Sequence, residues 1–137
     1  MDQQAINALK QAVIPLAREY DLKFIFLYGS QASGKANADS DIDIAVLGNH
    51  YLLPDPFLGI INDLADLLQS KNVDVKSLHD VSPLFRYQVT GKGILLYGKS
   101  FDYHSYKAYA FKAYHDSRSL LILQEKMIKK RLKYAHQ

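Results

Sequence analysis

Apolar positions along the chain recur with two different periods, and this difference predicts helices and strands in alternation. Apolar residues at helical spacing predict a helix over residues 3–20, which Pro15 should kink or split. Two short apolar runs favour strands, Lys23–Tyr28, which ends at Gly29, and Asp41–Leu47, whose first residues alternate polar and apolar. The first half of the chain is therefore expected to contribute a helix and two strands.

The second half continues the same alternation. Asp55 and Pro56 are expected to form the N-cap and first position of a helix that ends near Asn72. The remaining predicted elements are a strand at Val73–Leu78, a short helix opened by Ser82–Pro83, a strand at Ile94–Tyr97 and a helix from Tyr103 onward. This order indicates an α/β protein in which a small sheet of about four strands is packed with helices and followed by a helical tail.

Size and composition narrow the class of protein. A chain of 137 residues with 48% hydrophobic content can form one core. We therefore expect a single domain over residues 1–98 and a basic helical extension over residues 99–137 that packs on it. The chain has no apolar run of membrane-spanning length and no signal-peptide pattern, and it is expected to be soluble and cytoplasmic. Because it has no cysteine, a disulfide framework, a thiolate metal site and a cysteine nucleophile are excluded.

The net charge of +3 conceals an uneven distribution. Residues 1–98 carry 8 Lys and Arg against 11 Asp and Glu, a net −3, whereas residues 99–137 carry 9 against 3, a net +6. The tail is thus a basic, aromatic and amphipathic helix. It could pack on the body, form a docking surface for a protein partner, or contact nucleic acid, and the last is disfavoured because the basic run is short and the body is acidic.

The chemistry concentrates where the first strand ends and the second begins. Gly29-Ser30 follows the first strand, ten residues intervene, and Asp41-Ile42-Asp43 opens the second. Residues i and i+2 of a strand project from the same face, so the two carboxylates should lie side by side. Paired carboxylates favour Mg²⁺ held together with substrate phosphates, and a glycine-serine turn offers close backbone approach and donors to phosphate oxygens. Each motif alone is more often a turn or a solvated strand end.

The combined Gly-Ser-x10-Asp-x-Asp arrangement resembles the signature of the polymerase-β-like nucleotidyltransferase superfamily, and the short chain resembles its minimal nucleotidyltransferase (MNT) branch. The resemblance covers about residues 20–98 and matches Asp74 to a third family carboxylate. It implies that Asp41, Asp43 and Asp74 are catalytic and hold one or two Mg²⁺ ions, and that Gly29, Ser30 and Ser33 contact the phosphates of ATP. Many relatives have Arg where this chain has Ser33, so Lys35 or the tail could supply that cation.

The resemblance also implies a partner. Small MNT proteins are paired with HEPN-domain ribonucleases in toxin–antitoxin modules, in which the MNT protein transfers AMP from ATP to a tyrosine of the toxin and so neutralises it. The chain is similar to such antitoxins, and a hetero-oligomer with a HEPN toxin is expected. Two alternatives stay open, a non-catalytic antitoxin that acts by stoichiometric binding and a small-molecule nucleotidyltransferase of the aminoglycoside-modifying kind.

Overall fold

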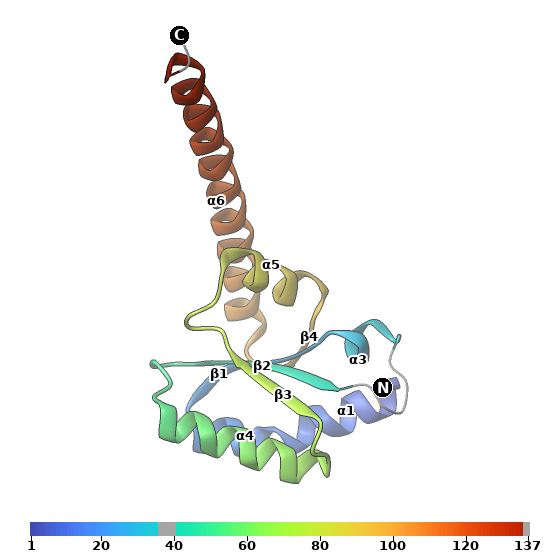
Figure 1. The fold of residues 1–137 in the computed structure, drawn as a ribbon. Coiled ribbons are helices and arrows are strands. Elements are labelled where there is room, and N and C mark those ends of the chain that lie inside the picture. Colours follow the sequence, from blue (N-terminus) through green and yellow to red (C-terminus); the bar gives the residue numbers. More distant parts are fainter. Residues whose placement is uncertain (36–40, 136–137) are drawn as a thin grey trace.

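The computed structural model describes residues 1–35 and 41–135 as a mixed four-stranded sheet with helices on both faces (Figure 1). The strands lie in the order β3-β2-β1-β4, with β1 antiparallel to β2 and β4, and β2 parallel to β3. In chain order the elements are α1 (Gln3–Ala12), α2 (Ile14–Glu19), β1 (Leu22–Tyr28), α3 (Ser30–Ser33), β2 (Ile42–Gly48), α4 (Pro54–Leu68), β3 (Val73–Ser77), α5 (Pro83–Lys92), β4 (Ile94–Tyr97) and α6 (Ser100–Ala135). The α/β class and the four predicted strands are confirmed.

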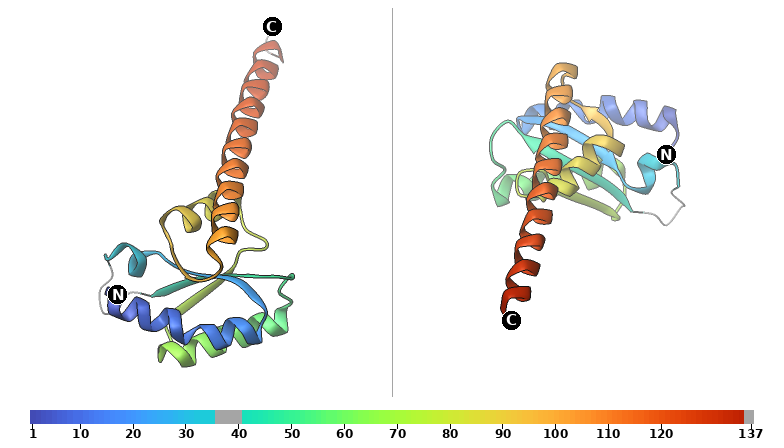
Figure 2. Two further views of the ribbon diagram at one scale, coloured as in Figure 1. Left: turned by 180° about the vertical axis from the view of Figure 1, so that it is seen from behind. Right: turned by 90° about the horizontal axis from the view of Figure 1, so that it is seen from above.

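The sheet has a core on each side, which explains why its central strands have no polar face. On β1, Ile25 and Leu27 pack with α1, α2 and α4, whereas Phe24 and Phe26 face α5 and the start of α6. All four side chains are fully buried. Figure 2 shows the two helical layers from behind and from above. Burial of each such side chain contributes about 1.5–3 kcal/mol relative to exposure, so β1 is held in the domain by both cores.

The N-terminal helix divides where the sequence predicted a kink. α1 is capped by Asp2, whose Oδ1 accepts a 2.7 Å hydrogen bond from the Ala5 amide, and it ends before Val13. α2 then begins with Pro15 in its first turn, where the missing N–H costs no helical hydrogen bond. The split follows from Pro15, because a proline inside a continuous helix removes a backbone hydrogen bond and clashes with the preceding turn.

The predicted boundaries of α4 are wrong at both ends, by two residues at the start and by about four at the end. Its N-cap position is Leu53 and Pro54 is its first residue, so Asp55 lies in the first turn, where a carboxylate still favours the positive end of the helix dipole. The helix ends at Leu68 because Gln69 takes a left-handed conformation, with φ of 50°, and stops it short of Asn72. α4 starts earlier than predicted because Pro54, two positions before Pro56, takes the first helical position. Its end was predicted too late because no glycine follows its last residue.

α5 begins as predicted, since the Ser82 hydroxyl accepts a 3.1 Å hydrogen bond from the Phe85 amide. α6 begins at Ser100, three residues before the predicted Tyr103. Its first half is fixed to α5 by the Tyr103 hydroxyl, which donates to the Thr90 carbonyl at 3.1 Å. Side-chain contact between the two helices continues at Arg86 and Tyr106, whose Nε and hydroxyl are 3.1 Å apart.

The second half of α6 leaves the body. Every described side chain from Arg118 to Ala135 is exposed, and the helix projects beyond the sheet in all three views (Figures 1 and 2). At 36 residues the helix is about 54 Å long. The extension expected to pack on the domain therefore does so only through its first half. No helix within residues 1–35 and 41–135 has the length and apolar character needed to cross a membrane.

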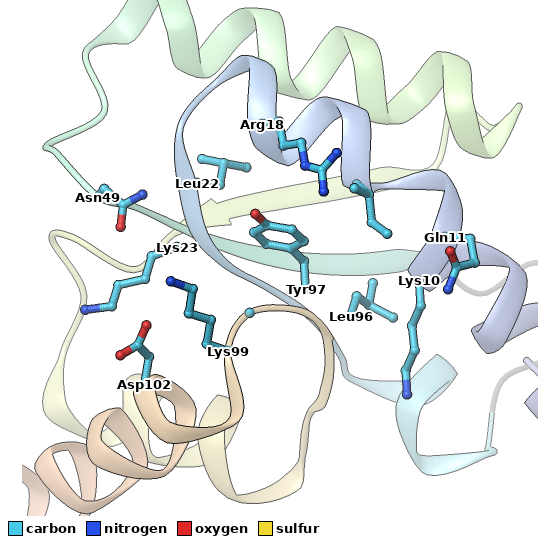
Figure 3. Close-up of a pocket in the computed structure, with 12 residues that line it drawn as sticks. Lys10, Gln11, Arg18, Leu22, Lys23, Asn49, Leu96, Tyr97, Lys99 and Asp102 are labelled. Carbon is cyan, nitrogen blue, oxygen red and sulfur yellow. The ribbon is translucent and has the colours of Figure 1, made fainter.

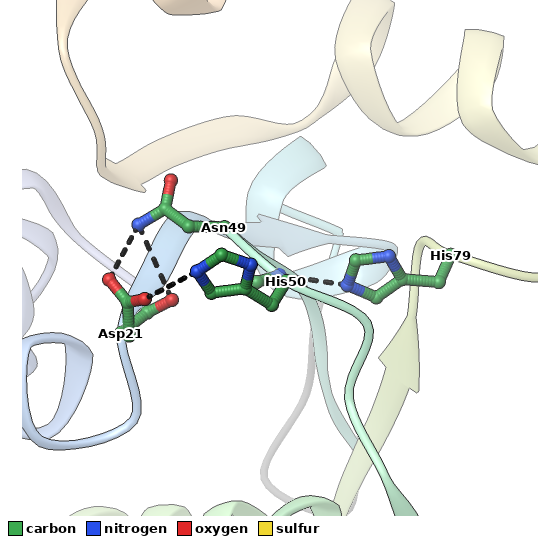
Figure 4. A network of polar contacts seen from close by, with 5 residues as sticks. Asp21, Asn49, His50 and His79 are labelled. Carbon is green, nitrogen blue, oxygen red and sulfur yellow. Dashed lines mark hydrogen bonds and ion pairs between the residues drawn. The ribbon is translucent and has the colours of Figure 1, made fainter.

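A polar network ties together the end of the sheet where β1 begins and β2 ends (Figure 4). The Asn49 amide donates to the Asp21 carbonyl at 3.0 Å, and its Nδ2 donates to Asp21 Oδ1 at 2.8 Å. The Gly48 amide donates to His79 Nε2 at 3.0 Å, which links β2 to the turn after β3. Burial lowers the pKa of His79, against an opposing effect of Asp80, so the imidazole stays neutral and able to accept.

Candidate active site

Strand pairing brings the acidic residues together at the other end of the sheet. Asp43 of β2 is paired with Asp74 of β3 on one side and with Tyr28 of β1 on the other. Paired residues of adjacent strands lie about 5 Å apart and project from the same face, so the two carboxylates and the phenol form one row. Asp41 lies just before β2 and is exposed, outside the strand in which it was predicted. The parallel pairing of β2 and β3 thus adds Asp74 to the row, and the charge of Asp74 raises the pKa of Asp43 more than that of Asp41 does.

The electrostatics of this row favour a bound cation. Burial raises the pKa of Asp43, the charges of Asp74 and Asp41 raise it further, and Lys76 opposes them. Lys76 lies 4.0 Å from Asp74, and both side chains are about half exposed, so this ion pair neutralises the site weakly. Burial, followed by the charges of Asp43 and Asp74, raises the pKa of Tyr28 to about 12. A cation between Asp43 and Asp74 would relieve this repulsion.

Gly29 fits the backbone closely against the Asp43 carboxylate. It has φ of 74° and ψ of −151°, a conformation that essentially only glycine adopts. A Cβ at this position would lie 3.2 Å from Asp43 Cγ and collide with Oδ2. The predicted juxtaposition of the Gly29-Ser30 turn and Asp43 is therefore present, and it depends on the absence of a side chain.

α3 is the single helical turn that follows. Ser30 opens it, as the sequence predicted, and the Ser33 amide donates to the Gly29 carbonyl at 3.1 Å. The Ser33 hydroxyl donates to the Ser30 carbonyl at 3.2 Å, so this side chain caps its own turn. The segment between α3 and β2, residues 36–40, lies outside the described residues.

A pocket of about 240 Å³ opens beside this turn, between the end of β1 and α5. Tyr28, Gly29 and Ser33 line one side, and the α5 residues that line the other are Phe85, Gln88, Val89 and Lys92. The Phe85 ring meets the Tyr28 ring edge-on, with centroids 5.5 Å apart. Sequence reasoning missed the α5 residues because they carry no motif. Only the folding of α5 across the sheet places Lys92 and Gln88 beside the glycine-serine turn.

A second hollow, of about 220 Å³, lies on the other side of the acids and is lined by Asp41, Lys71, Asn72, Val73 and Asp74. The two hollows flank Asp43 and its neighbours, so the row of carboxylates is accessible from both sides. A nucleotide in one hollow and an acceptor group in the other would meet at the acids.

The donor set fits Mg²⁺ if a nucleotide completes the coordination. Among the described residues, no three acidic, histidine or cysteine side chains converge into a preformed metal centre. Mg²⁺ is usually held by one or two carboxylates together with substrate phosphates and water, which is what Asp43 and Asp74 can offer. The predicted three-acid set of Asp41, Asp43 and Asp74 is thus not a preassembled cage.

A mixed sheet whose paired carboxylates face a glycine-serine turn defines the class of protein. Residues 11–102 match the polymerase beta, nucleotidyltransferase family, and the chain belongs to this family. The match includes every predicted site residue, from Gly29 to Asp74. The family predicted from the motif is confirmed.

Individual relatives are named as a protein adenylyltransferase or as parts of toxin–antitoxin complexes. The chain is 34% identical over 94 residues to the protein adenylyltransferase MntA of Aphanizomenon flos-aquae (strain 2012/KM1/D3), a match that covers 59% of this chain and 62% of that protein. It is similar to a chain of a toxin–antitoxin crystal structure with AMP-PNP, at 29% identity and a TM-score of 0.71, covering 86% of this chain and 98% of that chain. A complex of tri-AMPylated Shewanella oneidensis HEPN toxin with MNT antitoxin gives 26% identity and a TM-score of 0.67, covering 89% and 98%.

Proposed function

We propose that this chain is a protein adenylyltransferase antitoxin, which transfers AMP from ATP to a tyrosine hydroxyl of a HEPN-domain ribonuclease toxin and so neutralises it. The observation that carries the proposal is the row formed by Asp43 and Asp74 against Gly29, with a pocket on each side. The relative named protein adenylyltransferase and the similarity to toxin–antitoxin complexes support the reaction and the partner.

The reaction needs a nucleophile, a leaving group and a base that accepts one proton. The acceptor hydroxyl oxygen forms a bond to the α-phosphorus of ATP, the bond from that phosphorus to the bridging oxygen breaks, and pyrophosphate leaves. Mg²⁺, when bound, supplies charge neutralisation on the phosphates. We assign acceptance of the hydroxyl proton to Asp74, which is exposed at the edge of the row, and orientation of the site to Asp43, which lies against Gly29.

Many relatives have an Arg shortly after the Gly-Ser motif, and in this chain another residue supplies that positive charge. Ser33 occupies that position, and its hydroxyl is turned back to the Ser30 carbonyl. Lys92 of α5 lines the same pocket as Gly29 and Ser33 and is the one Lys or Arg among the described residues that line it. We therefore assign contact with the departing phosphates to Lys92 in place of the missing Arg, with backbone amides of the Gly29-Ser30 turn.

The second half of α6 provides a surface for the toxin. We define distal α6 as residues 118–135, which carry six Lys and Arg and one Glu. Large apolar side chains along it are between 44% and 62% exposed: Leu120, Leu121, Ile122, Leu123, Met127, Ile128, Leu132 and Tyr134. An apolar band of this length, edged by cations, fits a helical partner with an apolar groove and an acidic rim.

The test is transfer of label from [α-³²P]ATP to the copurified toxin. Asp43→Asn and Asp74→Asn should each lower transfer by at least a hundredfold, because each removes a carboxylate from the row. Asp66→Asn, on the exposed surface of α4, makes the same chemical change elsewhere and should retain wild-type transfer. Equal transfer by all three variants would refute the assignment of the site.

Two further outcomes separate the alternatives. A stoichiometric antitoxin would still neutralise its toxin when carrying Asp43→Asn, and a small-molecule enzyme would label an aminoglycoside in the absence of any protein acceptor. Deletion of residues 118–137 should leave the melting temperature nearly unchanged, because the distal helix contributes no buried side chain, and should abolish toxin binding. Retained binding by the truncated chain would refute the docking role of distal α6.

A further inference from the structure

A hollow larger than either of those beside the acids lies elsewhere on the described part of the chain. A cleft of about 530 Å³ lies beside β4, between the α1–α2 layer and the start of α6 (Figure 3). We call it the basic cleft, because four of its lining residues are Lys10, Arg18, Lys23 and Lys99, whereas its one acidic lining residue is Asp102. Its volume is in the range of pockets that hold a small ligand.

The basic cleft is positively charged, whereas residues 1–98 as a whole carry a net negative charge. Residues 1–98 carry a net −3, yet three of their eight cations line this one cleft and Lys99 follows directly. None of the four makes an ion pair within 4.0 Å with a carboxylate of residues 1–35 or 41–135. Cations gathered without internal partners repel one another and create a local positive potential that attracts anions.

The distribution of the cations indicates a ligand with several phosphates. They come from four separate segments: Lys10 from α1, Arg18 from α2, Lys23 from β1 and Lys99 from the turn before α6. In Figure 3, Lys10 lies at one end of the cleft and Lys23 and Lys99 lie at the other, with the Tyr97 ring and Leu96 between them. Charges at both ends of an aromatic and apolar floor suit a strand in which phosphates alternate with stackable bases.

The basic cleft is distinct from the acidic row. Lys23 lies near the start of β1 and Tyr28 lies at its end, five residues apart on one extended strand. At about 3.3 Å per residue, this places the Lys23 end of the cleft roughly 17 Å from Tyr28, and the cleft shares no lining residue with either hollow beside the acids. A nucleotide bound at Asp43 and Asp74 therefore does not fill the basic cleft.

We propose that the basic cleft binds the phosphates of a short stretch of single-stranded nucleic acid, with a base against Tyr97. This goes beyond the proposed transfer reaction and does not depend on it. It also departs from the sequence-based expectation, which disfavoured direct nucleic-acid binding, because that expectation weighed the short basic run of the tail and the net acidity of the body. The cations of the cleft are scattered along the sequence and are assembled only by folding.

The test is fluorescence anisotropy with a 3′-fluorescein-labelled ten-nucleotide oligoadenylate RNA, titrated with the full chain between 50 and 200 mM KCl. The double variant Lys23→Gln/Lys99→Gln should weaken binding on the order of tenfold at low salt. Each phosphate contact on a single strand contributes about 0.7 to the slope of log K against log salt, so the slope should fall by roughly 1.4. Lys10→Gln/Arg18→Gln, on the α1–α2 side of the cleft, should do the same.

The matched control is Lys107→Gln/Lys112→Gln, which removes two exposed cations from the first half of α6, outside the cleft. It should bind the RNA with the wild-type affinity and slope. Wild-type binding by both cleft variants, or equal loss in the control, would overturn the proposal.

Two competition arms identify the ligand. Unlabelled RNA should displace the probe more effectively as its length increases from two to ten nucleotides, whereas inorganic tripolyphosphate and ATP should compete weakly. Displacement by tripolyphosphate as effective as by RNA would overturn the nucleic-acid assignment in favour of a free polyphosphate. Asp43→Asn, which should abolish AMP transfer, should leave RNA binding unchanged, so failure of one proposal is distinguishable from failure of the other.

Discussion

Replacing Gly29 with alanine tests the central contact of the site, the close approach of the β1–α3 turn to Asp43. Gly29→Ala forces a side chain into a conformation with φ of 74° and ψ of −151°. Strain of this kind costs about 1–3 kcal/mol. The new methyl group also collides with Asp43 Oδ2, so the carboxylate must leave its position. We expect both lower stability and a large loss of AMP transfer.

The matched control is Gly34→Ala, at the other end of α3. Gly34 also has a positive φ, of 76°, but no atom of the described residues lies within 4 Å of the position its Cβ would take. It should cost about 1–2 kcal/mol of left-handed strain without moving any carboxylate. For a domain of this size, 1–3 kcal/mol corresponds to a fall in melting temperature of roughly 3–12 °C.

The two assays are thermal unfolding and label transfer from [α-³²P]ATP. Both glycine variants should unfold at lower temperature, but only Gly29→Ala should lose transfer, by a hundredfold or more. If Gly29→Ala transferred AMP at the wild-type rate, the reasoning that Asp43 works from its position against the glycine would be refuted. Equal loss of transfer in Gly34→Ala would assign the effect to α3 as a whole.

Three other substitutions have measurable consequences. Asp43→Asn relieves repulsion with Asp74, so without metal and at low salt it should raise the melting temperature by roughly 1–3 °C, a gain that added Mg²⁺ should erase. His79 has a lowered pKa when folded, so the unfolded chain binds more protons below the ordinary value of 6.5; stability is complete above that pH and is lost as the pH falls through the folded pKa. Urea unfolding between pH 7.5 and 5 should therefore show a steeper loss for the wild type than for His79→Gln, whose amide oxygen can still accept from the Gly48 amide. Tyr20→Phe removes the 2.7 Å hydrogen bond from the Tyr20 hydroxyl to Asp63 and should cost about 1 kcal/mol by the same method, whereas an unchanged midpoint would show that solvent replaces it.

The sheet could be predicted from the sequence because its strands are short apolar runs with clear ends. Residues 24–27 are buried on both faces and the strand ends before Gly29, so no amphipathic helix competes with it. Ser82 likewise predicts the start of α5, because its capping hydrogen bond with the Phe85 amide depends only on neighbouring residues. The glycine-serine turn and Asp43 were predictable for the same reason, since both belong to the ends of recognisable strands.

Features that depend on packing between distant segments could not be predicted in this way. Apolar residues of distal α6 have the spacing of a packed helix, but α5 and the first half of α6 already cover that face of the sheet. Lys92 enters the site only because α5 crosses over the end of β1. The pairing of Asp43 with Asp74 required the parallel register of β2 and β3, which no local pattern encodes.

The projection of α6 has a consequence for how the acceptor meets the acids. A toxin docked on distal α6, as proposed, is held on the same molecule as the acids, so its tyrosine samples the site at an effective concentration of roughly millimolar order. The open hollows around Asp43 then need little affinity of their own for the acceptor. A short tyrosine peptide cut from the toxin, lacking this tether, should be a far poorer substrate than the intact protein.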